Sequence, residues 1–279
     1  MNPKLYTKIS DRISVVRIMG VLNITPDSFS DGGVHFNLDD AVSEAERMLG
    51  AGADILDIGG ESTRPGAEPV SPEQELRRVL PVIESVHRKI PDAVISIDTY
   101  KSDVARQALE SGVTWVNDIS GGMFSPDMFD IVAQKGATMV ISHIKGAPRN
   151  MQKNPHYQDV VAEICEFLTL QTRKALDAGI SADKIIIDPG IGFGKRYEDN
   201  LKILKNLDKL KVLGYPLLIG TSRKSFIGHY TGEPDASHRD PASYVTFLWS
   251  AAMGADILRV HNVPGTMQVL KMAQVIGNQ

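Results

Sequence analysis

Three polar side chains stand at the ends of three different apolar runs, and together they could hold a flat nitrogen heterocycle. Asp98, Asn117 and Asp188 each close or follow a run of aliphatic residues. Carboxylates and an amide suit a heterocycle edge that presents amino and ring N–H donors, as a guanidine-like pyrimidine edge does. One buried aspartate is usually structural. Three polar strand ends, with Lys224 and Arg259 as cations beside them, favour a binding site, because unpaired buried charges are costly.

Two further segments could bind an anion. The segment 222–225, Ser-Arg-Lys-Ser, follows one apolar run, and Arg259 and His261 end another. Residues two apart share a face of a strand, so Arg259 and His261 could reach the same anion. The alternatives are a surface salt bridge for Arg259 and a hydrogen-bonded core histidine for His261.

A glycine-rich segment at 188–195 resembles a phosphate-binding loop but lacks its spacing. A Walker loop needs glycine at position 189, where Pro189 stands, and serine or threonine at position 196, where Arg196 stands. The dinucleotide-binding fingerprint also fails in spacing. The glycines are better explained as letting backbone pass close to a flat ligand beside Asp188, and a plain tight turn is nearly as good an explanation.

These residues need a scaffold that gathers strand ends, and the hydrophobic periodicity supplies one. Near-continuous aliphatic runs alternate with helical patterns throughout the chain. The predicted strands are 15–22, 54–59, 93–97, 114–116, 138–141, 184–187, 216–219 and 256–260. The predicted helices are 38–49, one opening at 71, 101–110, 127–134, 156–178, 197–210, 243–253 and 264–276.

Eight such units predict an α/β fold, a (β/α)8 TIM barrel of parallel strands with its active site at the C-terminal rim. No linker or charge block divides the chain, so residues 1–279 are expected to form one domain. Two long connections, 23–37 and 61–70, have the composition of lids that close over a substrate, although plain surface loops would look the same.

Composition narrows the partners to small molecules. The chain has 279 residues, of which 42% are hydrophobic and 23% charged, with a net charge of −4. A chain with this negative net charge lacks the excess of basic residues expected of a protein that binds nucleic acid or an anionic membrane. The single cysteine, Cys165, has no mate for a disulfide and no cluster for zinc, and no apolar stretch is long enough to span a membrane. A cytoplasmic location is expected.

With these residues in place, the sequence resembles the dihydropteroate synthases, the pterin-binding barrels of folate biosynthesis, along nearly its whole length. The matching stretches are 19–33, 59–66, 96–99, 117–119, 188–195, 221–226 and 259–261. The resemblance implies condensation of 6-hydroxymethyl-7,8-dihydropterin diphosphate with 4-aminobenzoate, giving dihydropteroate and diphosphate. It also implies Mg²⁺ as the metal and a homodimer as the assembly.

The resemblance also assigns roles to individual residues. Asp98 and Lys224 are the predicted catalytic residues, and Asn23 is the predicted Mg²⁺ ligand. The predicted pterin-binding residues are Asp98, Asn117, Asp188, Lys224 and Arg259. The predicted diphosphate-binding residues are Asn23, Thr63, Arg259 and His261. The predicted aminobenzoate-binding residues are Phe29, Thr63, Arg64, Pro65, Phe193 and Ser225.

Small departures from the family pattern fall near these residues. Asn262 stands where aspartate is more usual, which removes a negative charge near the predicted phosphate site. Ser142 and Ile144 flank His143 where methionines are common, which alters an apolar wall. These departures bear on affinity and leave the reaction class unchanged.

Two other functions fit parts of the pattern. A folate-dependent methyltransferase with a corrinoid partner uses a similar barrel, but it would have no use for a diphosphate clamp. A catalytically silent pterin-binding relative would have no need of Asn23, Asp98, Lys224, Arg259 and His261 together. The apolar residues near Phe247, Trp249 and Met253 could form either a dimer face or core.

Overall fold

Eight parallel strands form a nearly closed barrel in the computed structural model, which describes residues 11–25, 37–64 and 66–278. The strands are β1 (Arg17–Asn23), β2 (Ile55–Gly59), β3 (Ile95–Asp98), β4 (Trp115–Asp118), β5 (Thr138–Ser142), β6 (Ile185–Asp188), β7 (Leu218–Ile219) and β8 (Ile257–Val260). Their order is β6-β5-β4-β3-β2-β1-β8-β7. An isolated parallel bridge between Ile187 and Leu217 links the β6 and β7 ends of this order. The predicted barrel is confirmed.

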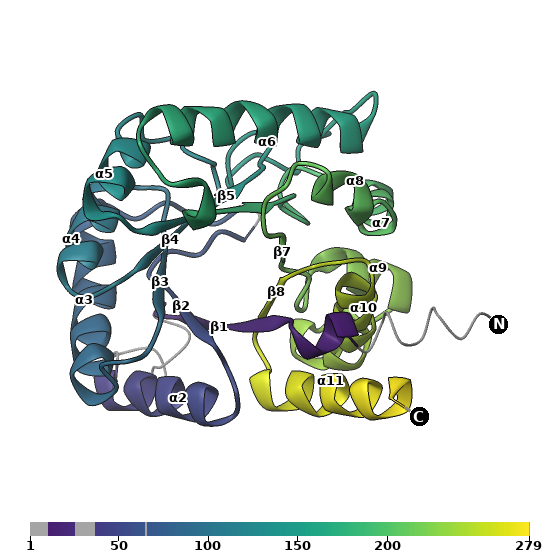
Figure 1. The fold of residues 1–279 in the computed structure, drawn as a ribbon, viewed down its shortest axis with the longest axis horizontal. Coiled ribbons are helices and arrows are strands. Elements are labelled where there is room, and N and C mark those ends of the chain that lie inside the picture. The colour runs from purple at the N-terminus through teal and green to yellow at the C-terminus, as the bar shows by residue number, and fades with distance from the viewer. Residues whose placement is uncertain (1–10, 26–36, 65, 279) are drawn as a thin grey trace.

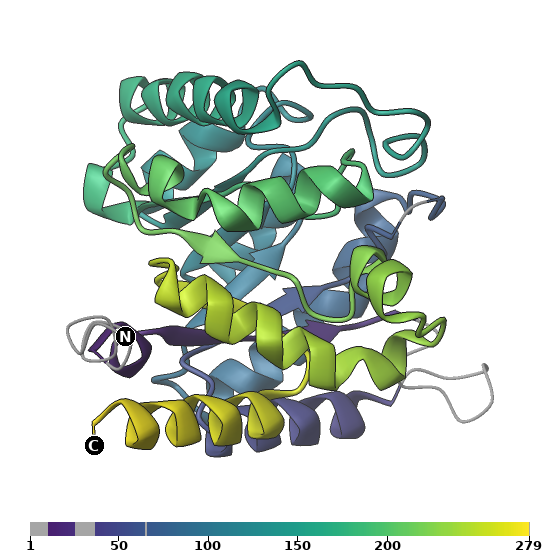
Figure 2. The same ribbon diagram turned by 90° about the vertical axis from the view of Figure 1, so that its right-hand side faces the viewer.

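Helices surround the strands on the outside of the barrel (Figures 1 and 2). The α-helices are α2 (Leu38–Gly50), α3 (Pro72–Lys89), α4 (Ser102–Glu110), α5 (Met128–Lys135), α6 (Val160–Asp177), α7 (Tyr197–Lys205), α8 (Leu207–Lys211), α9 (Ser225–Thr231), α10 (Asp240–Ala252) and α11 (Val263–Gly277). Two short 3-10 helices are η1 (Ala182–Lys184) and η2 (Ala236–Arg239). Within the described part of the chain, no helix has the length and apolar character needed to cross a membrane.

Local sequence signals set several helix ends. Ser71 and Gln74 form the predicted capping box at the start of α3, with Pro72 in the first turn. The long helix expected from residue 156 begins instead at Val160, because the Asp159 side chain accepts from the backbone N–H groups of Val161 and Ala162.

The structure differs from the prediction in the last third of the chain. The helix expected over 197–210 is two helices, with the break at Asn206. The helix α9 was not predicted, because it is short and contains Gly228. A side chain at position 228 would overlap the Glu233 carbonyl and the Arg239 guanidinium, so close tertiary packing explains this glycine.

The hydrophobic residues form two main layers. The larger layer lies between the outer faces of the strands and the helices. A smaller cluster consists of strand residues and fills the barrel, and its members are Met19, Ile55, Trp115, Val140, Ile186, Leu218 and Ile257. This inner cluster closes the floor beneath the C-terminal ends of the strands.

Candidate active site

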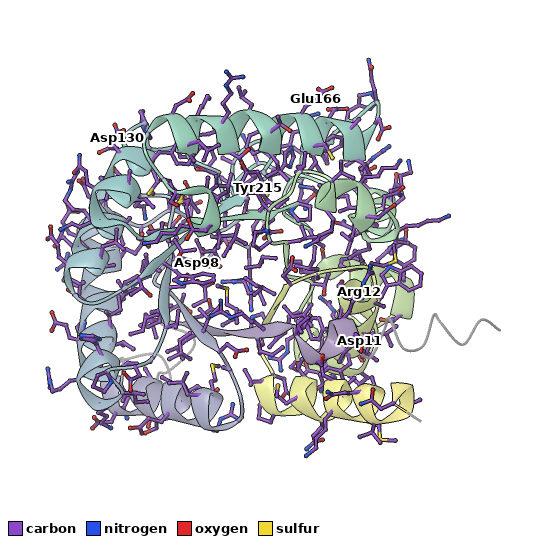
Figure 3. The ribbon with its side chains drawn as sticks, viewed as in Figure 1. Asp11, Arg12, Asp98, Asp130, Glu166 and Tyr215 are labelled. Carbon is purple, nitrogen blue, oxygen red and sulfur yellow. The ribbon has the colours of Figure 1, made fainter. Side chains whose placement is uncertain are left out.

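Strand alternation places the polar side chains above the inner cluster. Successive side chains of a strand point to opposite faces, so a residue two positions after an inner-cluster residue also points into the barrel. Five polar residues hold that position, namely Asp57, Asn117, Ser142, Asp188 and Arg259, which follow Ile55, Trp115, Val140, Ile186 and Ile257. Asp98 follows the buried Ser96 in the same way and lies near the centre of the molecule in Figure 3.

Arg259 joins three strands through two buried carboxylates. Its Nε donates to Asp57 Oδ2 at 2.5 Å, and its Nη2 donates to Asp98 Oδ2 at 2.6 Å. Asn117 Nδ2 donates to the same Asp57 oxygen at 2.9 Å. The second oxygens of Asp57 and Asp98 are buried and have no hydrogen-bond partner in the described part of the chain. Two acceptor atoms are therefore available to donors on a ligand.

The environment of Asp98 opposes its negative charge. Burial raises its pKa to about 7, Arg259 acts in the opposite direction, and Asp57 adds to the rise. A ligand that brings N–H donors or positive charge to Asp98 would favour the carboxylate form. Such a ligand would lower this pKa on binding.

Asp188 and Lys224 line the other side of the barrel mouth. Asp188 Oδ1 accepts from the Gly190 N–H at 2.7 Å, and its Oδ2 accepts from Ser142 Oγ at 3.4 Å. Burial raises the Asp188 pKa, and Lys224 is the main opposing influence. Lys224 Nζ donates to the Ile191 carbonyl and lies 4.6 Å from the centre of the Phe193 ring. Burial lowers the Lys224 pKa to about 8.

His261 lies in a cationic surrounding. Its Nδ1 is 2.9 Å from Ser222 Oγ, and its backbone N–H donates to the same oxygen at 3.2 Å. Burial, followed by the charges of Arg259, Arg223 and Arg64, lowers its pKa to about 3. The structure thus places Arg64, predicted from the loop after β2, close enough to act on the histidine. This region fits an anionic group.

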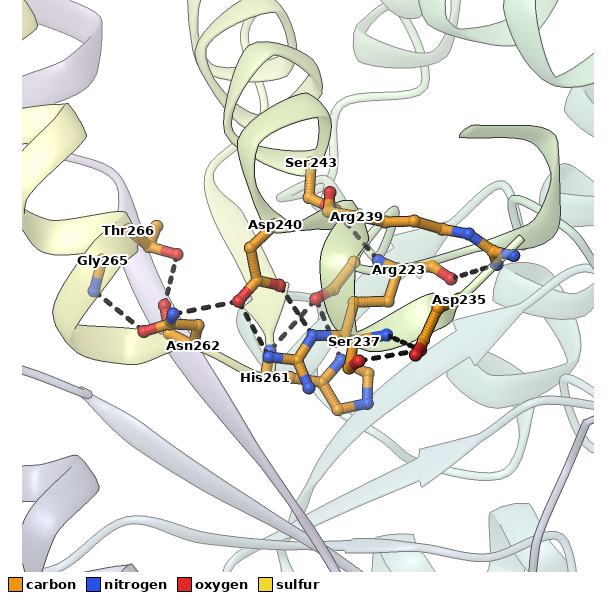
Figure 4. Close-up of polar contacts among 11 residues, drawn as sticks. Arg223, Asp235, Ser237, Arg239, Asp240, Ser243, His261, Asn262, Gly265 and Thr266 are labelled. Carbon is orange, nitrogen blue, oxygen red and sulfur yellow. Dashed lines mark hydrogen bonds and ion pairs between the residues drawn. The ribbon is translucent and has the colours of Figure 1, made fainter. Parts of the chain in front are cut away.

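A hydrogen-bond network holds the β7 and β8 ends together beside His261 (Figure 4). Arg223 binds Asp240 through two bonds, Nε to Oδ1 at 2.6 Å and Nη2 to Oδ2 at 2.8 Å. Asn262 Nδ2 also donates to Asp240 at 3.0 Å, while its Oδ1 accepts from the Gly265 N–H and caps α11. An aspartate at position 262 could not donate to Asp240. The amide therefore replaces like-charge repulsion with a hydrogen bond.

The other departures from the family pattern also lie at the site. Ser142 contacts Asp188, as described above. Ile144 is buried in a small cluster with Ile119 and Met151, against which Phe193 packs. A compact isoleucine thus contributes to the apolar wall beside the predicted pterin site.

The remaining predicted residues are distributed around the rim. Asn23 is the half-buried last residue of β1, Thr63 is half-buried, Arg64 is exposed, and Ser225 is the exposed first residue of α9. Phe29 and Pro65 lie outside the described residues, as does most of the predicted lid 23–37. The structure therefore brings together Asp98, Asn117, Asp188, Lys224, Arg259 and Phe193 in the barrel mouth, with His261 beside them.

Asp57, which shares Arg259 with Asp98, lies near a predicted strand end but was assigned no role in the predicted site. A signal was present in Ile55, Asp57 and Gly59, because the charged residue interrupts an apolar strand in the same phase as Asp188 after Ile186. Asp57 is shown to belong to the site only by its bond to Arg259, which lies more than 200 positions away in the sequence.

Sequence reasoning also missed the group of side chains that closes the loop 61–70. Glu61 Oε2 accepts from the Val70 N–H at 3.3 Å and from Lys101, and its Oε1 accepts from Tyr100 at 2.5 Å. Lys101 also binds the buried Glu75 at 2.5 Å. This cluster fixes both ends of the loop that carries Thr63 and Arg64.

The donor set near Asn23 bears on the predicted metal. Among the described residues, no three His, Cys, Asp or Glu side chains come together in a way that could hold a metal ion. Mg²⁺ commonly binds through one or two protein oxygens together with substrate phosphates and water. A single amide oxygen from Asn23 beside a diphosphate fits that kind of Mg²⁺ site. A site made of protein ligands alone would not match this coordination.

Comparisons with known proteins agree with this geometry. A family model described as pterin binding enzyme matches residues 19–261. The dihydropteroate synthase of Synechocystis is 46% identical over 93% of this chain and 89% of its own length. The chain therefore belongs to the pterin-binding enzymes, and within them to the dihydropteroate synthase family.

Solved structures extend the likeness to ligand complexes. A Xanthomonas albilineans dihydropteroate synthase with 4-aminobenzoic acid superposes with a TM-score of 0.88 at 43% identity, covering 95% of this chain and 94% of that one. The same organism's enzyme in complex with 7,8-dihydropteroate gives a TM-score of 0.85 at 40% identity over the same shares. Both are TIM barrels like the present one.

Proposed function

We propose that this chain condenses 6-hydroxymethyl-7,8-dihydropterin diphosphate with 4-aminobenzoate to give 7,8-dihydropteroate and diphosphate. The observation that carries the proposal is the bridge from Arg259 to Asp57 and Asp98, beside Asn117, at the centre of the barrel mouth. The 4-aminobenzoic acid and 7,8-dihydropteroate complexes of similar structures support it. The protein is a transferase of folate biosynthesis, as its relatives are.

The pterin would lie flat across the strand ends. Asp188 and Asn117 would hold its amino and ring N–H edge, and Lys224 would donate to the ring carbonyl or a ring nitrogen. The planar Arg259 guanidinium would stack on the ring, which a lysine ammonium could not do as well. Bound in this way, the pterin presents its methylene group toward Asp98 and His261.

The reaction would begin with loss of diphosphate. The carbon–oxygen bond breaks and its electron pair leaves with diphosphate, so that the methylene becomes a cation delocalised into the pterin ring. The Asp98 carboxylate stabilises this cation more than the neutral ground state. The aminobenzoate nitrogen then forms the new carbon–nitrogen bond and loses a proton, and no covalent intermediate with the protein is required.

The departing diphosphate would lie in the cationic region around His261. Arg259, His261 and Thr63 would bind its oxygens, and Asn23 would supply a neutral oxygen to Mg²⁺. When bound, the metal ion would neutralise charge on the leaving group. The aminobenzoate would lie against Phe193, Ser225, Arg64 and Thr63, with Phe29 and Pro65 contributed by the two long loops.

A coupled assay tests the proposal directly. Purified protein with both substrates and Mg²⁺ is expected to form dihydropteroate and to release one diphosphate per product. Methyl transfer without diphosphate release would support the corrinoid-dependent alternative instead. Pterin binding without diphosphate release in the presence of 4-aminobenzoate would identify a silent relative.

The pH dependence of kcat/KM for the pterin substrate is expected to be a narrow bell. Activity should rise toward pH 7 as Asp98, whose pKa burial raises to about 7, becomes a carboxylate. It should fall above pH 8 as Lys224, whose pKa burial lowers to about 8, loses its proton. Steady-state rates in overlapping buffers from pH 5 to 10 provide the measurement.

Lys224→Arg is the matched variant for this profile. A guanidinium stays charged across the range, so the alkaline limb should disappear even though the rate at the optimum falls. Substrate titration is the same in both proteins. An unchanged alkaline limb in the variant would show that Lys224 is not responsible for it.

We propose a homodimer formed through one outer face of the barrel. This face consists of the exposed apolar side chains Tyr197, Leu201, Tyr230, Val245 and Trp249. Its helices are joined, because Tyr197 stacks on His229 of α9 at 4.2 Å and Trp249 Nε1 donates to the Leu204 carbonyl of α7 at 2.9 Å. Exposed apolar side chains gathered on neighbouring helices are typical of subunit contacts.

Of the three residues that the sequence left open, only Trp249 belongs to the proposed face, and the partly buried Met253 packs against the core. Phe247 is 2% exposed and belongs to the core, whereas Trp249 is 51% exposed. Val245→Asp is expected to shift the protein from dimer to monomer in sedimentation velocity, because it adds a charge to an apolar contact. Met272→Asp, on the exposed side of α11 outside this face, should leave the dimer intact. A monomeric parent protein would contradict the proposed dimer.

We also propose that the protein is located in the cytoplasm.

A further inference from the structure

Lys195 is a buried lysine outside the proposed reaction. It ends the glycine-rich segment whose phosphate-loop spacing fails, and it is only 1% exposed. Its Nζ lies 2.9 Å from His143 Nδ1 and donates to the His143 carbonyl at 3.2 Å and the Phe193 carbonyl at 3.0 Å. Within the described ranges it forms no ion pair with a carboxylate. The lysine therefore binds its own loop and the neighbouring one.

The two loops joined by Lys195 also touch through glycines. Gly190 and Gly194 have positive φ angles of 66°. A side chain at position 190 would overlap the His143 carbonyl, and one at position 194 would overlap the Lys145 carbonyl. The loop 189–194 after β6 therefore lies directly on the loop 143–145 after β5. Lys195 supplies three of the hydrogen bonds at this contact, and Tyr157 Oη donates to the Gly194 carbonyl at 2.7 Å.

The hydrogen bonds between Lys195, His143 and the two carbonyls can form in either protonation state of the lysine. An ammonium donates to both carbonyls and to the lone pair of His143 Nδ1. A neutral amine donates to both carbonyls and accepts from a protonated Nδ1. His143 is neutral in both cases, because burial is the largest of the causes that lower its pKa to about 2, and burial is the same whether or not Lys195 carries its charge. The bonds to the two carbonyls thus persist whether or not burial, which lowers the pKa of Lys195, removes its proton.

The loop held by Lys195 forms part of the active site. The Ile191 carbonyl accepts from Lys224, and the Phe193 ring packs against the same lysine. Gln152 Nε2 and Asn200 Oδ1 bind Gly192 O and N at 2.7 Å each, so they fix the middle of the loop. The end of the loop at Phe193 is bound by Lys195.

We propose that Lys195 is a positioning residue that fixes the Phe193 end of the loop 189–194, and thereby shapes the wall against which 4-aminobenzoate binds. The proposal rests on the proposed function for its substrate. It assigns Lys195 no contact with either substrate. It also gives the lysine of the glycine-rich segment a role other than phosphate binding.

Lys195→Met tests this role, because methionine has a similar shape and cannot donate. The KM for 4-aminobenzoate is expected to rise by about 10- to 100-fold, as for a site group displaced by about 1 Å. The kcat and the KM for the pterin substrate should change by a smaller factor than the KM for 4-aminobenzoate, since Gln152 and Asn200 still hold the middle of the loop at Gly192. Amide hydrogen exchange in 189–194 should also become faster.

Lys184→Met is the matched control. Lys184 lies directly before β6, whereas Lys195 lies after the loop that follows β6. The Lys184 Nζ donates to the Gly136 carbonyl at the opposite end of the barrel. The KM values of the Lys184→Met variant and its amide hydrogen exchange in 189–194 should equal those of the parent protein. If Lys195→Met does not fold, Lys195→Gln is measured instead. Its shorter amide retains N–H donors but reaches less far, so its KM for 4-aminobenzoate and the exchange rate in 189–194 should both exceed those of the parent protein.

The outcomes separate this inference from the proposed function. Parent protein without turnover would overturn the proposed function, while hydrogen exchange would still test whether Lys195 holds the loop. Turnover by the parent with unchanged aminobenzoate KM and unchanged exchange in the variant would overturn the role of Lys195 alone. A uniform loss of active protein, with both KM values unchanged, would indicate ordinary stabilisation and would also overturn it.

Discussion

Replacing Asp98 by asparagine is expected to lower kcat by about a hundredfold, which corresponds to ~2.7 kcal/mol for one electrostatic group. The amide oxygen can still accept from Arg259 Nη2, now 2.6 Å from the carboxylate. The geometry should therefore survive while the negative charge is lost. Because that charge stabilises the cation formed at the methylene, the loss should appear in single-turnover product formation at saturating substrates.

Asp118→Asn is the matched control for Asp98. Asp118 is also a buried aspartate at the end of a strand, but it accepts from the Ser120 and Gly122 N–H groups of its own loop at 2.7 and 2.8 Å. Its substitution should change kcat by less than about fivefold, because it faces no predicted substrate atom. Equal turnover by Asp98→Asn and the parent protein would remove Asp98 from the reaction.

The stability of Asp98→Asn separates a catalytic defect from misfolding. Burial raises the Asp98 pKa to about 7, so between pH 4 and 7 the folded protein binds this proton more tightly than the unfolded chain. The parent protein should therefore lose stability as pH rises through this range, and the asparagine variant should lose less. Urea unfolding at pH 5 and pH 8 measures the difference.

Replacing Arg259 by methionine is expected to damage both stability and activity. The substitution leaves Asp57 and Asp98 buried without their shared cation, and breaking a buried pair in this way costs about 3–5 kcal/mol. It also removes the planar group proposed to stack on the pterin and to bind diphosphate. A fall in kcat/KM of at least about a hundredfold is expected for the fraction that remains folded.

Arg259→Lys tests whether the fork geometry matters as well as the charge. A single ammonium cannot reproduce donation from Nε to Asp57 and from Nη2 to Asp98. Stability should recover in part, whereas kcat/KM should stay well below that of the parent protein. Arg17→Met is the control, because Arg17 begins β1 at the other end of the barrel and packs over Trp115 at 5.1 Å. Parent-like kcat/KM in Arg259→Lys would contradict the role of the fork.

The strand ends show how far sequence patterns reach. Asp98, Asn117 and Asp188 could be placed in a barrel mouth because aliphatic runs fix the strands, and parallel strands bring their C-terminal ends to one rim. Their roles in binding remain predictions. The capping box at Ser71 was predictable for a similar reason, since it depends on residues three apart in sequence.

Other features depended on contacts between distant segments. The short helix α9 escaped prediction because Gly228 is unfavourable in a helix and is explained only by packing against Glu233 and Arg239. Asp57 could be placed near a strand end, but its role in the site was not predicted, because that role comes from sharing Arg259 with Asp98. The sequence spacing excluded Lys195 from a phosphate-binding loop. It could not show that Lys195 binds His143, because His143 lies in the loop after a different strand.

The sequence by itself determined the alternation of strands and helices, the barrel and the chemical types of group at its rim, because these follow from local periodicity and short motifs. The tertiary structure decided which charges meet. Arg259 pairs with Asp57 and Asp98, and Lys195 binds His143, through side chains brought together by closure of the barrel. Burial in that closed interior also shifts the pKa values of Asp98 and Lys224, which no local pattern encodes.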